Sequence, residues 1–406
     1  MTPGTRFLNM LPFQDALSYV LQNCRQLEPA LTPVEKARGL VLAQDVVALE
    51  AIPPFANTAM DGFAVRSSDV REPPATLRII ETIAAGHSPN MSVNAGEASR
   101  IMTGALIPDG ANAIVMVEQT QVDGDEVTVN ISVPAGNHVR PIGDDISKGE
   151  LVFEEGTILT PGHLGVLSSL GFREVIVFPR PRVGVISTGD ELVADGSALK
   201  AGQIRDSNRR TLLALLEEND MSPVDLGLLP DNEDVIEKGL VDGAAACDAL
   251  ITSGGVSMGD FDYVKSVLKR IGDMRWMQID IKPAKPLAFG LIDDTPIFGL
   301  PGNPVSSMVS FELFARPGLR AMMGRADPLR RRVVATAAES LGRRPDGKTH
   351  FVRAIVDYAD GKVFVRSGGG QGSHMLAAMA RSNSLAILPD GSGYSKGDRL
   401  EVLILG

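Results

Sequence analysis

The sequence has few cysteines, few aromatic residues and no long apolar run. Of its 406 residues two are Cys and one is Trp, and 5% are aromatic. Cys24 and Cys247 are too few for a disulfide framework and stand among apolar residues, so we expect buried thiols in a reducing compartment. There is no run of 18 apolar residues, and no basic segment precedes an apolar run at the N-terminus. The sequence therefore predicts a cytoplasmic protein without a membrane partner.

Positive charge is also scarce, since Lys and Arg number 39 against 50 Asp and Glu, giving a net charge of −11. This balance argues against binding to nucleic acid or to an acidic membrane, so an anionic substrate must be held by local groups. The five histidines show no paired ligand spacing, and the two cysteines are far apart, which argues against a zinc site.

The chain is long enough for several cores, and its patterns predict four domains. Apolar periodicity predicts a helix over residues 13–24, and caps followed by proline predict helices beginning at Thr32-Pro33 and Thr160-Pro161. Short apolar runs separated by turns predict a β-rich insertion between the helical segments. The expected domains are 1–51 with 150–180 (mostly helical, discontinuous), 52–149 (β-rich), 181–328 (α/β) and 329–406 (β-barrel or sandwich).

The fold class follows from the segment 181–328, where strand patterns alternate with helical patterns. Strands are expected at 183–186, 223–229, 249–251, 286–290 and 297–298, and helices at 209–218, 234–246, 263–271 and from 304 to about 314. This alternation predicts an α/β domain with a mostly parallel sheet. After residue 329 short strands with turns predict the small β domain.

Two glycine- and proline-rich loops in the α/β segment are the most informative feature. They cover 252–260 and 299–307, and each follows an apolar run and precedes a helical pattern. Such loops offer free backbone N–H groups and a helix N-terminus, which suit phosphate. Two of them at one edge of a parallel sheet predict a phosphorylated small molecule between them. The alternative is two tight turns without a ligand.

Charged residues stand beside these loops. Glu191, Asp231 and Asp262 each follow a predicted strand, at the edge where ligands of open α/β sheets bind, so with phosphate they predict a Mg²⁺ site. Lys282 and Lys285 are bracketed by prolines, and this rigid presentation suits an oxyanion. Taken singly, each carboxylate is better explained as a solvated turn residue, and each lysine is equally well explained as an exposed loop residue.

Two motif matches compete with this interpretation. Residues 342–349 match the Walker A expression, but the β-branched run after them predicts a strand where a P-loop requires a helix. Residues 255–259 match the G-x-S-x-G nucleophile elbow around Ser257, although the preceding glycines lengthen the turn, and His350 and His374 lie in the C-terminal β region. A serine hydrolase on Ser257 stays an alternative.

The whole chain is similar to the molybdopterin molybdenumtransferases, the MoeA and gephyrin E-domain family. Seven motifs carry the resemblance in the expected order: Ala59-Met60-Asp61-Gly62-Phe63-Ala64, Arg100-Ile101-Met102-Thr103-Gly104-Ala105, Ile186-Ser187-Thr188-Gly189-Asp190-Glu191-Leu192, Thr252-Ser253-Gly254-Gly255-Val256-Ser257 with Gly259-Asp260, Lys282-Pro283 with Lys285-Pro286, Gly299-Leu300-Pro301-Gly302-Asn303-Pro304-Val305-Ser306, and Gln371-Gly372-Ser373-His374.

The resemblance implies a homodimer whose active site lies between the α/β domain of one subunit and the β-rich domain of the other. It implies that adenylylated molybdopterin and molybdate react with Mg²⁺ to give molybdenum cofactor and AMP, with the molybdopterin adenylyltransferase as a possible partner. The implied catalytic residues are Asp61, Thr103, Asp145, Glu191, Asp231 and Asp262. The implied substrate-binding residues are Ser187, Thr188, Ser253, Gly254, Gly255, Lys282, Lys285, Pro301, Pro304, Ser306 and Ser373.

Two positions depart from the family pattern. Ala284 stands where the family often has glycine, and if that backbone needs a positive φ the alanine is strained by about 1 kcal/mol. Gln278 stands where some members have lysine, which removes a charge that binds an oxyanion. Both departures leave open a scaffold protein of the same fold that binds molybdopterin without catalysis.

Overall fold

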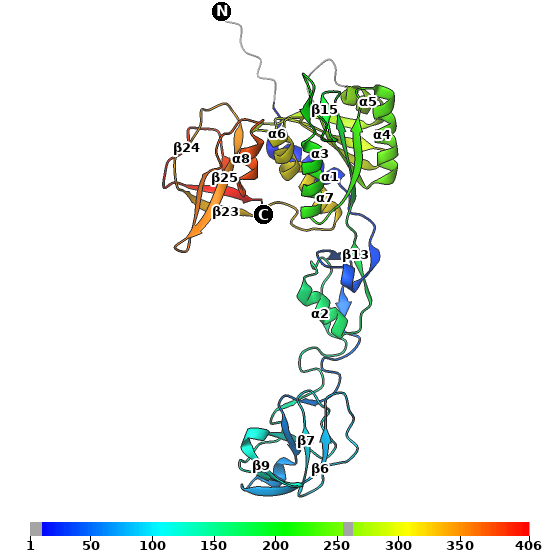
Figure 1. Ribbon diagram of the computed structural model, residues 1–406, viewed down its shortest axis with the longest axis vertical. Helices are drawn as coiled ribbons and strands as arrows, with labels where there is room; N and C mark the ends of the chain where they lie inside the picture. The colour runs from blue at the N-terminus through cyan, green and yellow to red at the C-terminus, as the bar shows by residue number, and fades with distance from the viewer. Residues whose placement is uncertain (1–9, 255–262, 406) are drawn as a thin grey trace, which may run out of the picture. The chain divides into compact units, whose positions relative to one another are not determined.

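The computed structural model describes residues 10–254 and 263–405, which fall into two compact units (Figure 1). Unit 1 spans Met1–Ala30, Gly39–Val41 and Phe178–Gly406, and unit 2 spans Leu31–Arg38 and Leu42–Val177. Each unit has its own hydrophobic cores. The finer division into four domains stays a prediction.

The centre of unit 1 is a six-stranded sheet in the order β17-β14-β18-β22-β21-β19. Its strands are β14 (Arg182–Thr188), β17 (Ser222–Leu229), β18 (Ala249–Ser253), β19 (Asp273–Gln278), β21 (Pro286–Ile292) and β22 (Thr295–Leu300). The first four in sheet order are parallel, as the sequence predicts. β21 pairs antiparallel with both of its neighbours, β22 and β19. It is joined to β22 by a two-residue turn, and a parallel crossover needs a far longer connection.

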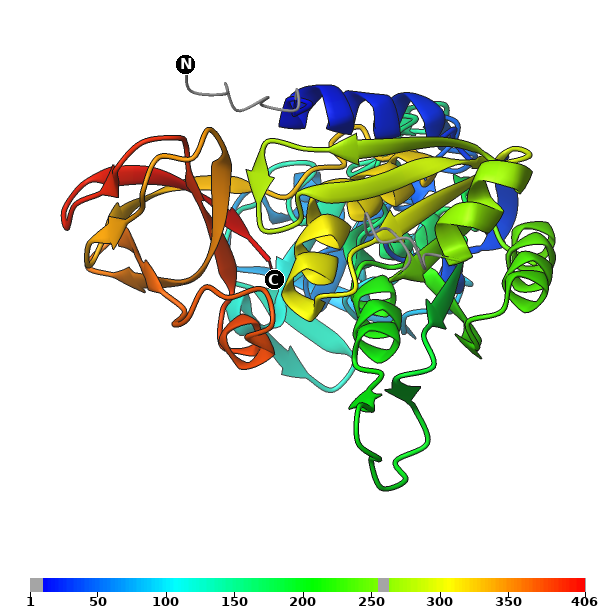
Figure 2. The ribbon, with the colours of Figure 1, turned by 90° about the horizontal axis from the view of Figure 1, so that it is seen from above.

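Helices cover both faces of this sheet (Figure 2). They are α1 (Phe13–Asn23), α3 (Asn208–Glu218), α4 (Glu233–Ala246), α5 (Tyr263–Ile271), α6 (Pro304–Ser310), the π-helical turn η4 (Phe311–Ala315) and α7 (Arg316–Met322). Because both faces are covered, β14 and β18 are apolar along nearly their whole length. The predicted helices at 13–24, 209–218, 234–246 and 263–271 are confirmed.

The C-terminal part of unit 1 is a closed five-stranded barrel. It is formed by β23 (Arg332–Ala337), β25 (Thr349–Ala359), β26 (Lys362–Ser367), β27 (Ser384–Leu388) and β29 (Arg399–Ile404), and β25 pairs with both β26 and β27. The short strand β20 (Ile281–Lys282) pairs in parallel with the start of β25, and α8 (Leu376–Ala380) lies between β26 and β27 in sequence. The residues after the Walker-like 342–349 therefore form a strand, as predicted, and the segment is not a P-loop.

Unit 2 contains a second six-stranded sheet in the order β8-β5-β7-β6-β10-β9. Its strands are β5 (Gly62–Val65), β6 (Ala75–Ile83), β7 (Glu97–Ile101), β8 (Ala113–Met116), β9 (Thr120–Asp123) and β10 (Glu126–Val129). Shorter elements are β1 (Ala30–Pro33), β2 (Val41–Leu42), β3 (Val46–Val47), β4 (Asn57–Thr58), β11 (Val139–Arg140), β12 (Leu151–Phe153), β13 (Glu174–Phe178) and α2 (Pro161–Ser169).

One predicted helix of this region is confirmed and one is wrong. Thr160 caps α2 through a capping box with His163, as its Thr-Pro sequence predicts. The helix predicted at Thr32-Pro33 is absent: Ala30–Pro33 is strand β1, and a single 3-10 turn, Val34–Lys36, follows it. Pairing of β1 with β13 overrides the local cap signal, since sheet contacts outweigh a weak helix preference.

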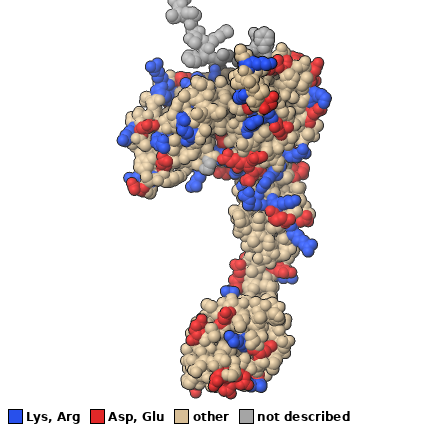
Figure 3. Space-filling model, viewed as in Figure 1, with Lys and Arg blue, Asp and Glu red and all other residues tan. Residues whose placement is uncertain are grey.

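Lysine and arginine are interspersed with aspartate and glutamate over the face shown in Figure 3.

No helix of the described residues is both long and apolar enough to span a membrane.

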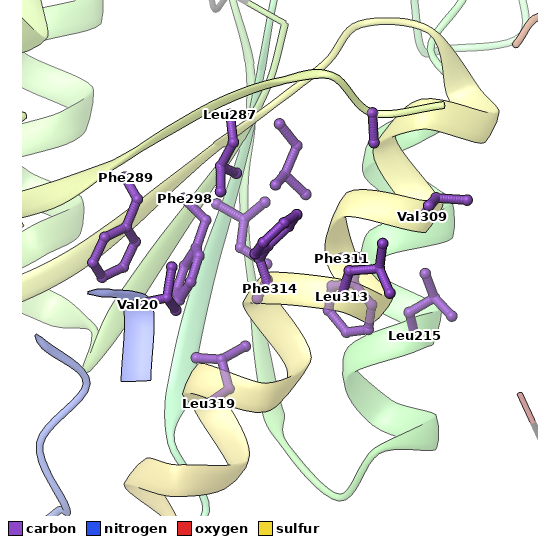
Figure 4. Packing of buried hydrophobic residues seen from close by; sticks show 14 of the residues in the cluster. Val20, Leu215, Leu287, Phe289, Phe298, Val309, Phe311, Leu313, Phe314 and Leu319 are labelled. Atoms are coloured by element: carbon purple, nitrogen blue, oxygen red, sulfur yellow. The ribbon is translucent and has the colours of Figure 1, made fainter. Parts of the chain in front are cut away.

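A cluster of buried aromatic and aliphatic side chains fixes the sheet of unit 1 against α1, α6 and α7 (Figure 4). Phe289 and Phe298 on neighbouring strands have ring centroids 5.0 Å apart, and both are fully buried. Val20 of α1 and Phe314 belong to the same cluster. Burial of this much apolar surface holds the sheet rigid, so the loops at its edge extend from fixed strand ends.

Candidate functional site

Four parallel strands of unit 1 end at the same edge of the sheet. Thr188 of β14 pairs with Leu229 of β17, while Ser187 of β14 pairs with Ser253 of β18, which in turn pairs with Leu300 of β22. The carboxyl ends of the strands are therefore level. The segments after them carry the predicted residues Glu191, Asp231, Gly254, Pro301 and Pro304, which places these residues on one edge, as expected from the sequence.

The loop after β14 folds its acidic side chain back onto its own backbone. Gly189 has φ +139, and a Cβ added there would collide with the carboxylate of Glu191. Asp190 and Asp231 are joined reciprocally: the Asp231 N–H donates to Asp190 Oδ1 at 3.1 Å, and the Asp190 N–H donates to Asp231 Oδ2 at 3.4 Å. Two acidic loops from different strands are thus held side by side.

The segments at the ends of β18 and β22 also contact each other, through main-chain atoms of residues that include two glycines. The Gly254 N–H donates to the Leu300 carbonyl at 3.0 Å, and a Cβ added to Gly302 would lie 3.8 Å from the Gly254 Cα. A small cavity of about 100 Å³ adjoins these glycines. It is lined by Thr188, Glu191, Leu192, Ile204, Arg205, Asp206, Ser207, Asn208, Ser253, Gly254, Gly302 and Pro304.

The segment Asp206–Arg209, at the start of α3, is a part of this edge that the sequence analysis did not identify. Asp206 is only 5% exposed; its carboxylate accepts from the Ser187 hydroxyl at 3.1 Å and from Arg209 Nε at 2.9 Å. Arg209 also contacts Asp225 on β17. Asn208 Nδ2 donates to the Gly302 carbonyl at 2.7 Å. From the sequence alone, these side chains cannot be distinguished from ordinary turn and helix-cap residues.

The predicted lysines line a second cavity of unit 1, of about 440 Å³. Its lining is Ile281, Lys282, Pro283, Ala284, Lys285, Pro286, Ser306, Lys348, Gln371, Gly372 and Ser373. The Val305 N–H donates to the Ser373 carbonyl at 3.2 Å, which ties the loop after β22 to the glycine-rich segment of the barrel. Lys282, Lys285, Ser306 and Ser373, predicted from separate motifs, are therefore brought together.

Ala284, at the centre of the lysine-bearing loop, has φ +70 and is 3% exposed. Glycine adopts this conformation freely and alanine does not, so the expectation of strain at this alanine is met.

Arg353 is a buried cation that sequence reasoning missed. Its side chain is fully buried, and its Nη2 donates to the carbonyls of Gly370 at 2.7 Å and Gly372 at 3.2 Å. Nε and Nη1 have no hydrogen-bond partner among the described residues. Burial lowers the pKa of this guanidinium, since no carboxylate offsets the loss of water. It lines a cavity of about 480 Å³ that shares Lys282, Pro283 and Gln371 with the lysine cavity.

In unit 2, Asp61 and Thr103 form a hydrogen-bonded pair. Asp61 Oδ1 accepts from the Thr103 N–H at 2.6 Å and from the Thr103 hydroxyl at 2.8 Å. The backbone N–H first, and then the hydroxyl, hold the pKa of this carboxyl below its usual range. Asp145 lies on another turn, where its N–H donates to the Ile52 carbonyl at 2.9 Å, and it makes no hydrogen bond to Asp61 or Thr103.

The carboxylates of the sheet edge fit a hydrated hard cation only in part. Among residues 10–254 and 263–405 no group of three or more His, Cys, Asp or Glu side chains is arranged to hold a metal ion. Asp231 and Glu191 share the edge, and Mg²⁺ commonly keeps several waters and needs one or two carboxylates. The third predicted ligand, Asp262, lies outside the described residues, as do Gly255 and Ser257.

Three family models cover most of the chain in order. The MoeA N-terminal region (domain I and II) matches residues 11–171, the probable molybdopterin binding domain matches 184–321, and the MoeA C-terminal region (domain IV) matches 335–405. The chain belongs to the MoeA family. The sheet edge, the lysine cavity and the barrel thus fall in the second and third of these matches, and the Asp61–Thr103 pair falls in the first.

Curated relatives and a solved structure agree with this assignment. The molybdopterin molybdenumtransferase of Haemophilus influenzae is 37% identical over 98% of this chain and 96% of its own length. Molybdopterin molybdenumtransferase 2 of Mycobacterium tuberculosis is 40% identical over 94% of this chain and 96% of its own length. The crystal structure of a MoeA molybdopterin biosynthesis protein from Pyrococcus horikoshii matches with a TM-score of 0.79 at 30% identity, covering 98% of this chain and all of that one.

Proposed function

We propose that this protein inserts molybdenum into adenylylated molybdopterin, using molybdate and Mg²⁺ and releasing AMP. The observation that carries the proposal is that the glycine loops after β18 and β22 meet the acidic loops after β14 and β17 at one edge of a parallel sheet, beside a cavity lined by lysines. Membership of the MoeA family supports the same reaction.

The phosphate end of the substrate is assigned to the loops after β18 and β22. Gly254 and Gly302 carry no side chains, so a phosphate can approach their backbone closely, and Ser253 and Thr188 line the same cavity. Pro301 and Pro304 restrict the backbone of the second loop, which keeps its amide groups in a fixed orientation. Asp231 and Glu191, with Asp262, would hold Mg²⁺, which when bound offsets the negative charge of the pyrophosphate.

Molybdate is assigned to the lysine cavity and the adjoining cavity of Arg353. Lys282 lines both cavities, and Lys285, Ser306 and Ser373 line the first. The two unpartnered nitrogens of the buried Arg353 support this assignment, because a buried cation without a counter-ion is stabilised by a bound anion. The protein supplies no nucleophile in this scheme; it orients two anions and stabilises their charge.

A homodimer completes the proposal. Asp61, Thr103 and Asp145 of unit 2 would act on the substrate bound by unit 1 of the partner subunit. The ionised Asp61 carboxylate, held by Thr103, supports a polar rather than a packing role, because the pair is exposed. Delivery of substrate by the molybdopterin adenylyltransferase and a reducing cytoplasmic location also belong to the proposal; the buried free thiols of Cys24 and Cys247 support the latter.

Turnover with adenylylated molybdopterin, molybdate and Mg²⁺ tests the function directly. AMP release that depends on both molybdate and Mg²⁺ is expected. Mixed dimers test the shared site: co-expressed Asp61→Ala and Asp231→Ala subunits should regain activity that neither variant has alone, because one of the two sites is then intact. No AMP release by the wild-type protein would contradict the function and favour the scaffold alternative.

The same preparation tests the hydrolase alternative. Covalent labelling by a fluorophosphonate that disappears in Ser257→Ala would support a hydrolase, whereas we expect no labelling.

A further inference from the structure

Pro301 and Pro304 restrict the two ends of the loop between β22 and α6, but the Gly302–Asn303 peptide between them has few contacts that set its orientation. Pro301 and Pro304 lack N–H groups, and Gly302 has no side chain. Asn303 is the N-cap residue of α6, yet its side chain makes no capping hydrogen bond. Gly302 and Asn303 are exposed, so packing does not hold them either. The orientation of the Gly302–Asn303 peptide therefore depends on a bond from another element.

Asn208 provides such a bond. Its Nδ2 donates to the Gly302 carbonyl at 2.7 Å, although the two residues are 94 positions apart. Asn208 is the first residue of α3, and the residue two before it, Asp206, holds Ser187 and Arg209. The start of α3 therefore ties the loop after β22 to the end of β14. Asp206 and Asn208 both line the 100 Å³ cavity beside Gly254.

We propose that Asn208 is a positioning residue for the nucleotide end of the substrate. By fixing the Gly302 carbonyl, it determines the direction of the whole Gly302–Asn303 peptide, because the peptide is planar. It thereby sets the gap between Gly302 and Gly254, where the phosphate is assigned. The inference rests on the proposed function, since it specifies how one wall of that site is held.

Titration of AMP with Mg²⁺ into the whole protein tests the proposal. Asn208→Ala should bind AMP roughly three- to tenfold more weakly, the effect of losing one ordering hydrogen bond. Alanine is a better helix former than asparagine, so the variant is expected to fold with an unchanged melting temperature. Thr211→Ala is the matched control: Thr211 also loses one hydrogen bond to backbone, the Ser207 carbonyl, but that bond stays within α3. It should bind AMP as the wild type does.

Turnover separates a positioning role from a general structural one. In Asn208→Ala the KM for adenylylated molybdopterin should rise, while the KM for molybdate, which is assigned to the other cavity, stays unchanged. Wild-type AMP affinity in Asn208→Ala, or an equal rise of both KM values, overturns the inference.

The inference and the proposed function fail in distinguishable ways. A wild-type protein that binds AMP without turning over contradicts the function alone. Equal AMP affinity of the wild type and Asn208→Ala contradicts the inference alone, and a wild type that does not bind AMP overturns both.

Discussion

Asp190 and Asp231 exchange hydrogen bonds, each accepting the other's backbone N–H on its carboxylate. Because the two residues follow neighbouring strands, this exchange locks the acidic loops of β14 and β17 together. Two carboxylates are thereby kept near each other although like charges repel, since each is partly compensated by an N–H. A cation at this edge would reduce the remaining repulsion.

Asp231→Asn should therefore strongly reduce catalysis without unfolding the protein. The amide oxygen can still accept from the Asp190 N–H, while the charge is lost. We expect Mg²⁺-dependent AMP release to fall on the order of 100-fold. Asp195→Asn is the control, since Asp195 is exposed and its carboxylate accepts from the nearby Ser197 N–H, within its own loop. Circular dichroism checks the fold, and wild-type turnover in Asp231→Asn would remove this residue from the site.

Arg353 should be required for the rise in melting temperature that a bound oxyanion causes. A bound tetrahedral oxyanion stabilises the wild-type protein, by about 3–5 °C at a hundredfold excess over Kd. Arg353→Met should lose this shift, because the buried charge that the anion neutralises is gone. Arg366→Met should keep it, since Arg366 is an exposed barrel residue already paired with Asp357. Differential scanning fluorimetry with molybdate and sulfate measures both, and an equal shift in Arg353→Met would contradict the assignment.

The ionisation of Asp61 should depend on Thr103. Two donors lower the Asp61 pKa in the folded state, so its contribution to stability is present above the unfolded pKa of about 3.9 and is lost as the pH falls through the lower folded pKa. Thr103→Val removes the hydroxyl but keeps the N–H, so the pKa should rise only part of the way. Thr120→Val, which removes a hydroxyl bonded to the Val117 carbonyl, should leave it unchanged. Carboxyl ¹³C NMR follows the titration; an unmoved Asp61 pKa would refute the coupling.

Replacing Ala284 by glycine should lower the free energy of unfolding less than the same replacement at Ala288. Ala284 has φ +70, so glycine relieves backbone strain of about 1 kcal/mol while removing one buried methyl group. Ala288 on β21 is equally buried without a positive φ, so there glycine only removes contacts and adds unfolded-state entropy. Chemical denaturation should give a free energy of unfolding about 1 kcal/mol higher for Ala284→Gly than for Ala288→Gly. Equal values would mean that the alanine is unstrained.

The common edge at which the parallel strands of unit 1 end was predictable, because buried parallel strands are easily identified in a sequence as apolar runs. Val183–Ile186 is an apolar run followed by Ser187-Thr188-Gly189, and the same order of strand, small residues and helix recurs at Ser253. Parallel strands place their C-terminal loops on one edge of the sheet, so Glu191 and Asp231 were expected there. Their catalytic roles stay predictions.

The residues that support this edge were not predictable, because their function depends on distant partners. Asp206 and Asn208 look like ordinary helix-start residues until Ser187 and Gly302 are seen against them. One feature of the sequence could have revealed the burial of Arg353. It stands two residues from Phe351 in an alternating strand, which places a cation on the same face as a buried ring. A strand position at Thr32-Pro33 depends on β13, more than 140 residues later, and no local pattern reveals it.

The helix α1 belongs to a core whose buried members beyond residue 24 all follow unit 2 in the chain, from Val183 onward. Val20 packs with Phe298 and Phe314, while all of Leu42–Val177 lies between them in the chain. At about 5–20 residues per second, the ribosome needs roughly 15–60 s to reach Phe298 after making Val20. During that interval unit 2 has everything required to close its own sheet, whereas α1 leaves the exit tunnel with its apolar stripe uncovered. We therefore expect the apolar stripe of α1 to be covered only after the strands and helices of unit 1 have been made.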